Sequence, residues 1–161
     1  MLYKYPYQSQ LGMITLLAND HELLGAWFEN QVNYGGQFDL DSVQSVTNHH
    51  QSAIIDQAIK WLDAYFKKQP LEAIDFRLMP QGTALQQDVW TELQKIPYGK
   101  TITLEQLVDR IKARQTKGHG SENAVMCAVR SNPIAIMIPS YRVLNSGIDF
   151  PIKEVLLTNE L

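Results

Sequence analysis

The spacing of apolar residues in this chain of 161 residues changes from a strand pattern to a helix pattern. Two apolar runs, GMITLLA and LLGAWFEN, flank the polar NDHE, an arrangement typical of a β-hairpin. From Ser52 to Lys68 the apolar residues recur at helical spacing, and AIDFRLMP then alternates as a short strand before Pro80. β structure over residues 3–37 followed by one helix predicts a small α+β domain, with an antiparallel sheet, over residues 1–80.

Residues 81–161 are predicted to form a second, mostly helical domain. Three polar positions are placed to cap helices: Thr83, Thr103, and either Ser121 or Asn123. A last helix is expected from Ile152 to Asn159, while KARQTKGHGS has the composition of a loop. Two short helices joined by this polar, glycine-containing segment are compatible with a helix-turn-helix, although helix pairs are common in α-rich domains.

The composition is that of a globular protein, with 45% hydrophobic and 19% charged residues. No apolar run approaches the ~20 residues that a membrane span needs, and MLYKYPYQSQ lacks the pattern of a secretion signal. The single cysteine, Cys127, excludes an internal disulfide and fits a reducing compartment. We therefore expect a cytoplasmic protein with no membrane partner.

The net charge of −3 hides an asymmetry between the two halves. Residues 1–80 carry 5 basic and 9 acidic side chains, whereas residues 81–161 carry 9 and 8. Four of these nine basic residues lie close together in the sequence: Arg110, Lys112, Arg114 and Lys117. Such a segment either contacts DNA phosphates or forms a solvated surface, and the sequence leaves both interpretations open.

Several residues with reactive or aromatic side chains are interpreted as structural. Trp61 and Trp90 lie on predicted apolar helix faces and are expected in the core. Cys127 is expected to be a small buried hydrophobe rather than an alkyl acceptor. The four histidines show no metal-ligand spacing: His21, His49, His50 and His119. We expect neither a metal nor a cofactor.

The stretch IPSYRVLNSG, from Ile138 to Gly147, follows an apolar run that starts at Ile134. This order predicts a buried strand or extended segment that delivers one polar side chain, Ser140, into a pocket. Ser140 is then a nucleophile, a hydrogen-bonding group or what remains of a different site. PSYR is not a Gly-x-Ser-x-Gly elbow and no histidine has motif support as a base, which argues against a serine hydrolase.

Longer segments place Ser140 in a known context. The stretches GTALQQDVWTELQKIPYGKTIT, AVMCAVRSNPIAIMIPSYRV and IKEVLLTNE together resemble the C-terminal domain of the O6-alkylguanine-DNA alkyltransferases, the methylated-DNA–protein-cysteine methyltransferases. The beginning, YPYQSQLGMITLLAND…LLGAWFENQ, is similar to the N-terminal β domain of that family. The resemblance covers nearly the whole chain. It implies an α+β fold with a C-terminal α-rich, winged-helix-like domain that binds DNA through a helix-turn-helix.

Active members of that family hold a cysteine at the position of Ser140 and a histidine at that of Tyr141. The resemblance implies a thiolate that attacks the alkyl carbon on O6 of a flipped guanine, activated through the histidine and a glutamate, here Glu160. A serine hydroxyl is a poorer nucleophile, and a phenol with a pKa of about 10 cannot serve as the base near neutral pH. We therefore interpret the chain as a homologue without dealkylating activity.

Other positions also differ from the family pattern. Asn123 stands in place of the arginine that the family inserts into the duplex, and Leu104 in place of the tyrosine that pushes the nucleotide out. Met126 and Cys127 replace small residues of the recognition helix. The loop that closes over the alkyl group is reduced to GIDFP, residues 147–151.

Some family positions are retained, and they define a vestigial site together with the two altered ones. In the family, Asn132 joins the recognition helix to the active-site turn. The vestigial site comprises Asn132, Ser140, Tyr141, Arg142 and Glu160. The retained residues are those that a preserved fold requires.

Two functions remain open on the sequence. In the first, related to DNA repair, the protein retains weak binding to double-stranded DNA or to alkylated bases. Its candidate contact residues are Arg110, Lys112, Arg114, Lys117, Asn123 and Arg130. In the second, it does not bind DNA and acts through unidentified protein partners or a small ligand in the vestigial site.

Overall fold

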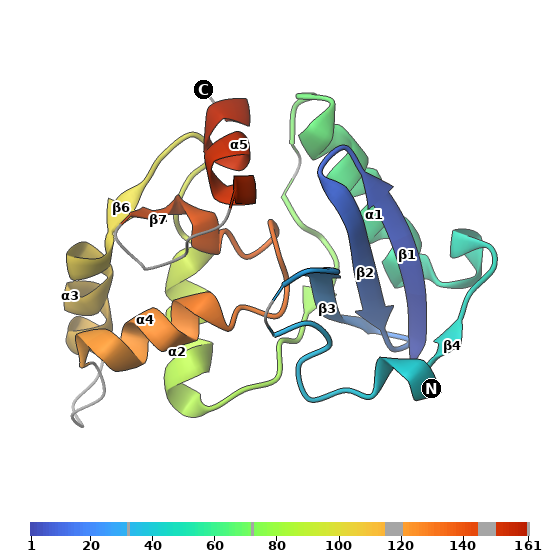
Figure 1. The fold of residues 1–161 in the computed structure, drawn as a ribbon, viewed down its shortest axis with the longest axis horizontal. Helices are drawn as coiled ribbons and strands as arrows, with labels where there is room; N and C mark the ends of the chain where they lie inside the picture. Colours follow the sequence, from blue (N-terminus) through green and yellow to red (C-terminus); the bar gives the residue numbers. More distant parts are fainter. Residues whose placement is uncertain (32, 72, 115–120, 145–150, 161) are drawn as a thin grey trace. The chain divides into compact units, whose positions relative to one another are not determined.

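A computed structural model describes residues 1–161 apart from Val32, Glu72, residues 115–120, residues 145–150 and Leu161. The chain divides into two compact units, Met1–Pro80 and Gln81–Leu161 (Figure 1). The first unit contains a β-sheet and one long helix, and the second is mainly helical. The α+β fold class predicted from the sequence is confirmed.

The first unit is built on three antiparallel strands with short parallel strands at both edges. The strands are β1 (Tyr3–Ser9), β2 (Gly12–Ala18), β3 (Glu22–Phe28), β4 (Gln44–Ser45) and β5 (Arg77–Leu78). Their order is β4-β1-β2-β3-β5. The predicted hairpin is therefore the β2–β3 pair, but β structure in this region ends at Phe28 rather than at residue 37. The parallel edge pairs, which join residues far apart in the sequence, were not predicted.

Helix α1 (Ala53–Phe66) covers the sheet and begins where the sequence predicts. Ser52 is its N-cap, because the Ser52 Oγ accepts a hydrogen bond from the Ile55 amide at 3.2 Å. The assignment of Trp61 to the core is wrong, since this residue is only half-buried. Its ring instead stacks on Tyr65, one turn along the helix, at a centroid distance of 5.7 Å.

The described part of the second unit contains four α-helices and a small parallel pair of strands. They are α2 (Ala84–Leu93), β6 (Ile102–Thr103), α3 (Leu104–Arg114), α4 (Glu122–Arg130), β7 (Val143–Leu144) and α5 (Pro151–Asn159). The loop predicted for KARQTKGHGS is wrong at its beginning, because α3 continues through Arg114. Its later part, with Lys117 and His119, lies outside the described residues.

Local capping chemistry explains where these helices begin. Thr83 forms a capping box with Gln86, and Thr103 forms the same reciprocal pair with Gln106. Ser121 rather than Asn123 caps α4, because its Oγ accepts from the Ala124 amide at 3.1 Å. The capping positions predicted from the sequence are thus confirmed.

The side chain of Trp90 connects α2 to α4 through the core of the second unit. Trp90 is 2% exposed, which confirms its predicted place in the core, and its indole N–H donates to the Ala128 carbonyl at 2.9 Å. Helices α2, α3 and α4 all contact one another. The α3–α4 pair therefore rests on α2 and is held in a fixed orientation. None of the helices in the described part of the chain is long and apolar enough to cross a membrane.

Candidate functional site

The segment that precedes Ser140 is a series of tight turns, so the predicted strand or extended segment is wrong. The Met137 amide donates to the Ala135 carbonyl at 2.8 Å, which closes a three-residue turn around Ile136. Ile136 has a φ of 70°, an unfavourable value for a β-branched residue. A second turn follows at Pro139, where the Ser140 amide donates to the Ile138 carbonyl at 2.9 Å. The apolar residues are buried by folding back on themselves rather than by pairing in a sheet.

Asn132 fastens this turn to the end of α4. Its side-chain oxygen accepts from the Ile134 amide at 3.0 Å. Its side-chain nitrogen donates to the Ile138 carbonyl at 2.6 Å and to the Ser140 Oγ at 3.2 Å. Asn132 is only 3% exposed, so these bonds are shielded from water. Asn132 thus occupies the joining position that the resemblance implies.

Glu160 lies at the centre of a buried polar cluster. Its Oε1 accepts from the Gly99 amide at 3.0 Å and from the Arg142 Nε at 2.8 Å. Its Oε2 accepts from the Arg142 Nη2 at 3.0 Å and from the Tyr141 hydroxyl at 2.5 Å. A carboxylate offers about four acceptor positions, and four donors occupy them here. Glu160 is therefore fully bonded without any water or ligand.

Arg142 completes this cluster and balances the buried charge. The second terminal nitrogen of its guanidinium donates to the Ile96 carbonyl at 2.8 Å. Its central carbon also lies 5.4 Å from the ring centre of Tyr141 and 5.7 Å from that of Tyr98. Tyr141, Arg142 and Glu160 are all buried. A fixed, neutral arrangement of donors and acceptors thus stands directly beside Ser140.

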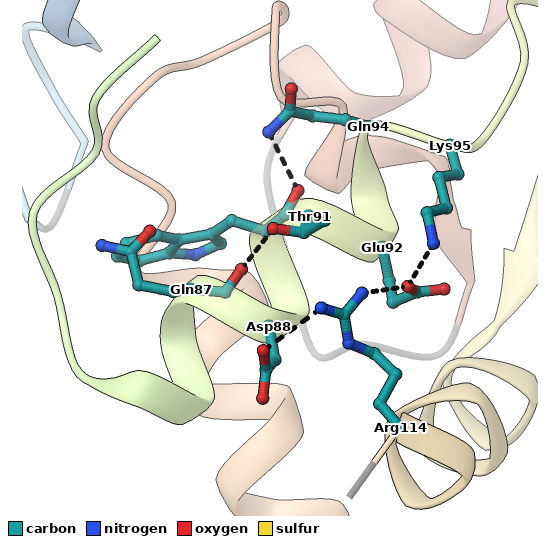
Figure 2. A network of polar contacts seen from close by, with 8 residues as sticks. Gln87, Asp88, Thr91, Glu92, Gln94, Lys95 and Arg114 are labelled. Carbon is teal, nitrogen blue, oxygen red and sulfur yellow. Dashed lines mark hydrogen bonds and ion pairs between the residues drawn. The ribbon is translucent and has the colours of Figure 1, made fainter.

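The basic residues predicted to contact DNA fall into different environments. Arg114 forms ion pairs with Glu92 at 2.6 Å and Asp88 at 3.4 Å, both on α2 (Figure 2). It therefore ties the end of α3 to α2, although the residue remains exposed. The other described members of the predicted set are exposed as well: Arg110, Lys112, Asn123 and Arg130. Lys117 lies outside the described residues.

Glu92 is the buried partner in this network. It also accepts a hydrogen bond from Lys95 at 2.8 Å (Figure 2). Burial raises the pKa of Glu92, but the hydrogen bonds and charges of Lys95 and Arg114 lower it by more, so the net pKa lies below its ordinary value. Glu92 is thus ionised in the folded protein at neutral pH.

The prediction that Cys127 is buried is wrong, because this side chain is exposed on α4. The core side of α4 is formed by Val125, Ala128 and Val129. The run AVMCAV is apolar throughout, but the flanking Asn123 and Arg130 lie on the same helix face as Cys127 and mark the side that faces solvent. Leu104, in contrast to the exposed Cys127, is buried: it is 3% exposed at the start of α3.

Metal ligation has no support in the described part of the chain. There, no three side chains of histidine, cysteine, aspartate or glutamate are grouped so that they could hold an ion. His49 has its Nδ1 2.8 Å from Asp56, a pair that joins a short 3-10 helix to the first turn of α1. We interpret this pair as structural.

The Tyr141 hydroxyl can be tested by removing it alone. We expect Tyr141→Phe to lower the free energy of unfolding by about 1.5–3 kcal/mol, because a buried carboxylate loses a donor. The matched control is Tyr98→Phe, whose hydroxyl is exposed and lies 3.4 Å from the Asn159 carbonyl. We expect it to change stability by less than about 0.5 kcal/mol. Equal losses for the two variants in urea titrations contradict this account.

The lowered pKa of Glu92 predicts a pH-dependent stability. A group whose pKa is lowered by folding stabilises the protein above its ordinary pKa of 4.5 and loses that effect as the pH falls toward the lowered value. We expect Glu92→Gln to cost about 1–2 kcal/mol at pH 7, since its cationic partners are partly exposed. The difference from the wild type should shrink below about pH 4.5.

Glu105→Gln is the control for this measurement, because Glu105 is exposed on α3. Its free energy of unfolding should follow that of the wild type at every pH. A Glu92→Gln deficit that stays constant down to pH 3 contradicts the assigned role of the Glu92 charge.

Both units of the chain match domains of one known protein family. Residues 1–80 match the family described as 6-O-methylguanine DNA methyltransferase, ribonuclease-like domain. Residues 84–154 match the DNA binding domain of the same family. The two matches together cover most of the chain.

Individual relatives agree with this assignment. A methylated-DNA–protein-cysteine methyltransferase of Methanosarcina acetivorans is 33% identical over 169 aligned residues, which cover 99% of this chain and 98% of the relative. A protein of the same name from Methanosarcina barkeri is 40% identical over 114 residues, covering 65% and 66% of the two chains. The Mycobacterium tuberculosis OGT crystallised in complex with DNA has a TM-score of 0.80 and 28% identity, covering 98% of this chain and 92% of that one. The chain therefore belongs to the O6-methylguanine DNA methyltransferase family.

Proposed function

We propose that this protein binds DNA and alkylated bases but does not accept an alkyl group from them. The observation that carries the proposal is the complete occupation of the Glu160 carboxylate by Gly99, Tyr141 and Arg142. A carboxylate bonded in this way has no acceptor position left with which to orient a base. Among the described residues, no group that could remove its proton contacts the Ser140 hydroxyl.

Alkyl transfer to a protein needs both a strong nucleophile and a group that removes its proton. Transfer to the protein requires a soft, ionised nucleophile, which the family obtains from a cysteine thiolate. At the matching position this chain has Ser140, and the described hydrogen bond at its Oγ comes from the Asn132 amide, a donor. The Tyr141 hydroxyl donates a hydrogen bond to Glu160, and the structure describes none that it accepts from Ser140. Both requirements for a nucleophile at neutral pH are therefore unmet.

The support for DNA binding comes from the family and from the surface of the helix pair. The M. tuberculosis relative was crystallised with DNA, and residues 84–154 match the family's DNA binding domain. In this chain α3 exposes Arg110 and Lys112, and α4 exposes Asn123 and Arg130. Because Arg114 is already paired with two carboxylates, we expect few phosphate contacts and weak, salt-sensitive affinity.

A second candidate function is binding to a protein or small ligand without DNA. Three observations favour it: Arg114 is held by acidic residues, Glu122 is exposed at the start of α4, and Leu104 is buried where the family uses a tyrosine. The salt dependence of DNA binding separates the two candidates. Binding at low salt that weakens as the salt concentration rises supports the first, and no binding at low salt supports the second.

Intact-mass spectrometry tests the absence of alkyl transfer. After incubation with duplex DNA containing O6-methylguanine, we expect no methyl adduct on the wild-type protein, because Ser140 lacks both a thiolate and a base. The double variant Ser140→Cys, Tyr141→His restores both groups and serves as the positive control. A methyl adduct on the wild-type protein contradicts the proposal.

Fluorescence anisotropy at several salt concentrations tests the DNA-binding surface. Removing one basic side chain that touches a phosphate should reduce the slope of log K against log salt by about 1. We expect this reduction for Arg130→Gln, which removes an exposed charge of α4. Arg114→Gln is the matched control and should leave the slope unchanged, because this charge is committed to Asp88 and Glu92. Equal slopes for the wild type and Arg130→Gln contradict the role assigned to Arg130.

A further inference from the structure

The first unit contains a buried hydrogen-bond donor without an acceptor, the indole N–H of Trp27. Trp27 is 0% exposed, and its Nε1 has no hydrogen-bond partner among the described residues. This nitrogen is also shielded from solvent, so water does not reach it in this conformation. A buried donor without an acceptor costs the whole free energy of its lost hydration. The conformation around Trp27 is therefore less stable than its apolar packing alone suggests.

Trp27 lies on the face of the sheet that α1 does not cover. In β2, Ile14 and Thr15 are neighbours, so their side chains point to opposite faces. Tyr7 pairs with Ile14 across the strands and donates its hydroxyl hydrogen to Asp63 of α1 at 2.7 Å, which identifies the helix side. Trp27 pairs with Thr15 and therefore points to the other side.

Residues Asn33–Leu40, between β3 and β4 along the chain, cover Trp27 on that side, and we call them the strap (Figure 1). The ring centres of Tyr34 and Phe38 both lie 6.4 Å from that of the indole. Leu40 belongs to the same buried cluster as Trp27, and Phe38 packs against this cluster. The strap thus shields the indole by apolar contacts.

Local turns form the middle of the strap. Its described main-chain hydrogen bonds join residues three apart, as between the Gly36 amide and the Asn33 carbonyl at 2.9 Å. The Tyr34 hydroxyl adds a hydrogen bond to the sheet, 2.7 Å from the Thr15 Oγ1. Because the turns are internal to the strap, they survive when the strap moves away from the sheet, whereas the Tyr34–Thr15 bond breaks.

Two consecutive glycines lie at the centre of the strap. Gly35 and Gly36 have φ values of 81° and 55°, which glycine adopts without steric cost. A Cβ added to Gly36 would lie 3.4 Å from the Trp27 Cζ2, and no other described heavy atom would be within 4 Å of it. Cζ2 is on the nitrogen side of the indole. The strap therefore has its most adaptable backbone, and room to move, beside the N–H that lacks an acceptor.

We infer that the strap is a lid that turns at Gly35–Gly36 and controls access to Trp27. Opening breaks the hydrogen bond between Tyr34 and Thr15, but it lets water accept from the indole N–H, which offsets part of the apolar contact that is lost. The strap opens at a smaller cost than the sheet unfolds. The opened face offers one donor beside the apolar side chains of Leu17 and Leu24, which suits a ligand with a hydrogen-bond acceptor on an apolar group.

Hydrogen exchange of the Trp27 indole N–H, followed by NMR on the full chain, tests this lid. The reference is the set of main-chain amides of β2, the central strand of the sheet, each rate being scaled to that of the same group in an unstructured peptide. We expect the Trp27 N–H to exchange about tenfold faster or more than these amides. Low urea concentrations should accelerate the β2 amides but not the Trp27 N–H, because opening exposes little surface.

Two tyrosine variants separate opening of the strap from unfolding of the unit. Tyr34→Phe removes the bond to Thr15, and we expect it to accelerate exchange of the Trp27 N–H about three- to tenfold, the worth of one neutral hydrogen bond. Tyr7→Phe is the matched control, because it removes a hydroxyl from the helix side, where the strap makes no contact with Asp63. It should accelerate the β2 amides while the Trp27 rate stays within about twofold.

Three results overturn the inference. They are a Trp27 N–H that exchanges as slowly as the β2 amides, equal acceleration of both by Tyr7→Phe, and no acceleration of the Trp27 N–H by Tyr34→Phe. Thr15→Val breaks the same hydrogen bond from the sheet side and should give the acceleration expected of Tyr34→Phe. This second variant keeps the test decisive where Tyr34→Phe does not fold.

Discussion

The buried pairing of Glu160 with Arg142 is the interaction on which the second unit depends. It joins the end of the chain to Gly99, in the turn after α2, and to the segment that carries Ser140. Removal of one partner from a buried ion pair leaves an uncompensated charge, which costs far more than the pair itself contributes. Position 141 must therefore supply a donor to Glu160, and the Tyr141 hydroxyl does so. Tyr141 keeps the hydrogen bonding around Glu160 intact. It differs from the histidine expected at this position in that its phenol does not titrate near neutral pH.

The same frame holds a strained turn. Ile136 adopts a positive φ although it is β-branched, a conformation that costs on the order of 1–3 kcal/mol. It persists because Ile134, Ile136 and Ile138 are all buried and Asn132 fixes both ends of the turn. Strain of this kind concentrates at binding and catalytic sites. Its presence next to Ser140 favours a site that still binds a ligand over one with no remaining use.

Features set by local chemistry were predictable from the sequence, and features set by distant contacts were not. Thr83, Thr103 and Ser121 are recognisable as caps because each bonds an amide only three residues away. Cys127 lies four residues after Asn123 and three residues before Arg130, which places all three on one face of α4. This polar spacing indicates that Cys127 is exposed, and the prediction failed because it considered only the apolar neighbours of Cys127. Vestigial-site residues such as Asn132 and Glu160 were identified by resemblance. The Glu160 hydrogen bonds span up to 61 residues and became visible only in the structure.

The ion pairs of Arg114 show why counting basic residues in one segment overstates a DNA-binding surface. Asp88 and Glu92 neutralise this charge, so electrostatic attraction falls to the exposed Arg110, Lys112 and Arg130. Under the proposed function, so few basic residues available for phosphates predict weak binding to ordinary duplex at physiological salt. For a protein that recognises rare bases, weak general binding is an advantage, because ordinary sites outnumber alkylated ones by a very large factor and compete for the protein. Under the proposed function, discrimination between ordinary and alkylated bases then rests on the vestigial site beside Glu160 rather than on the charge of the helix pair.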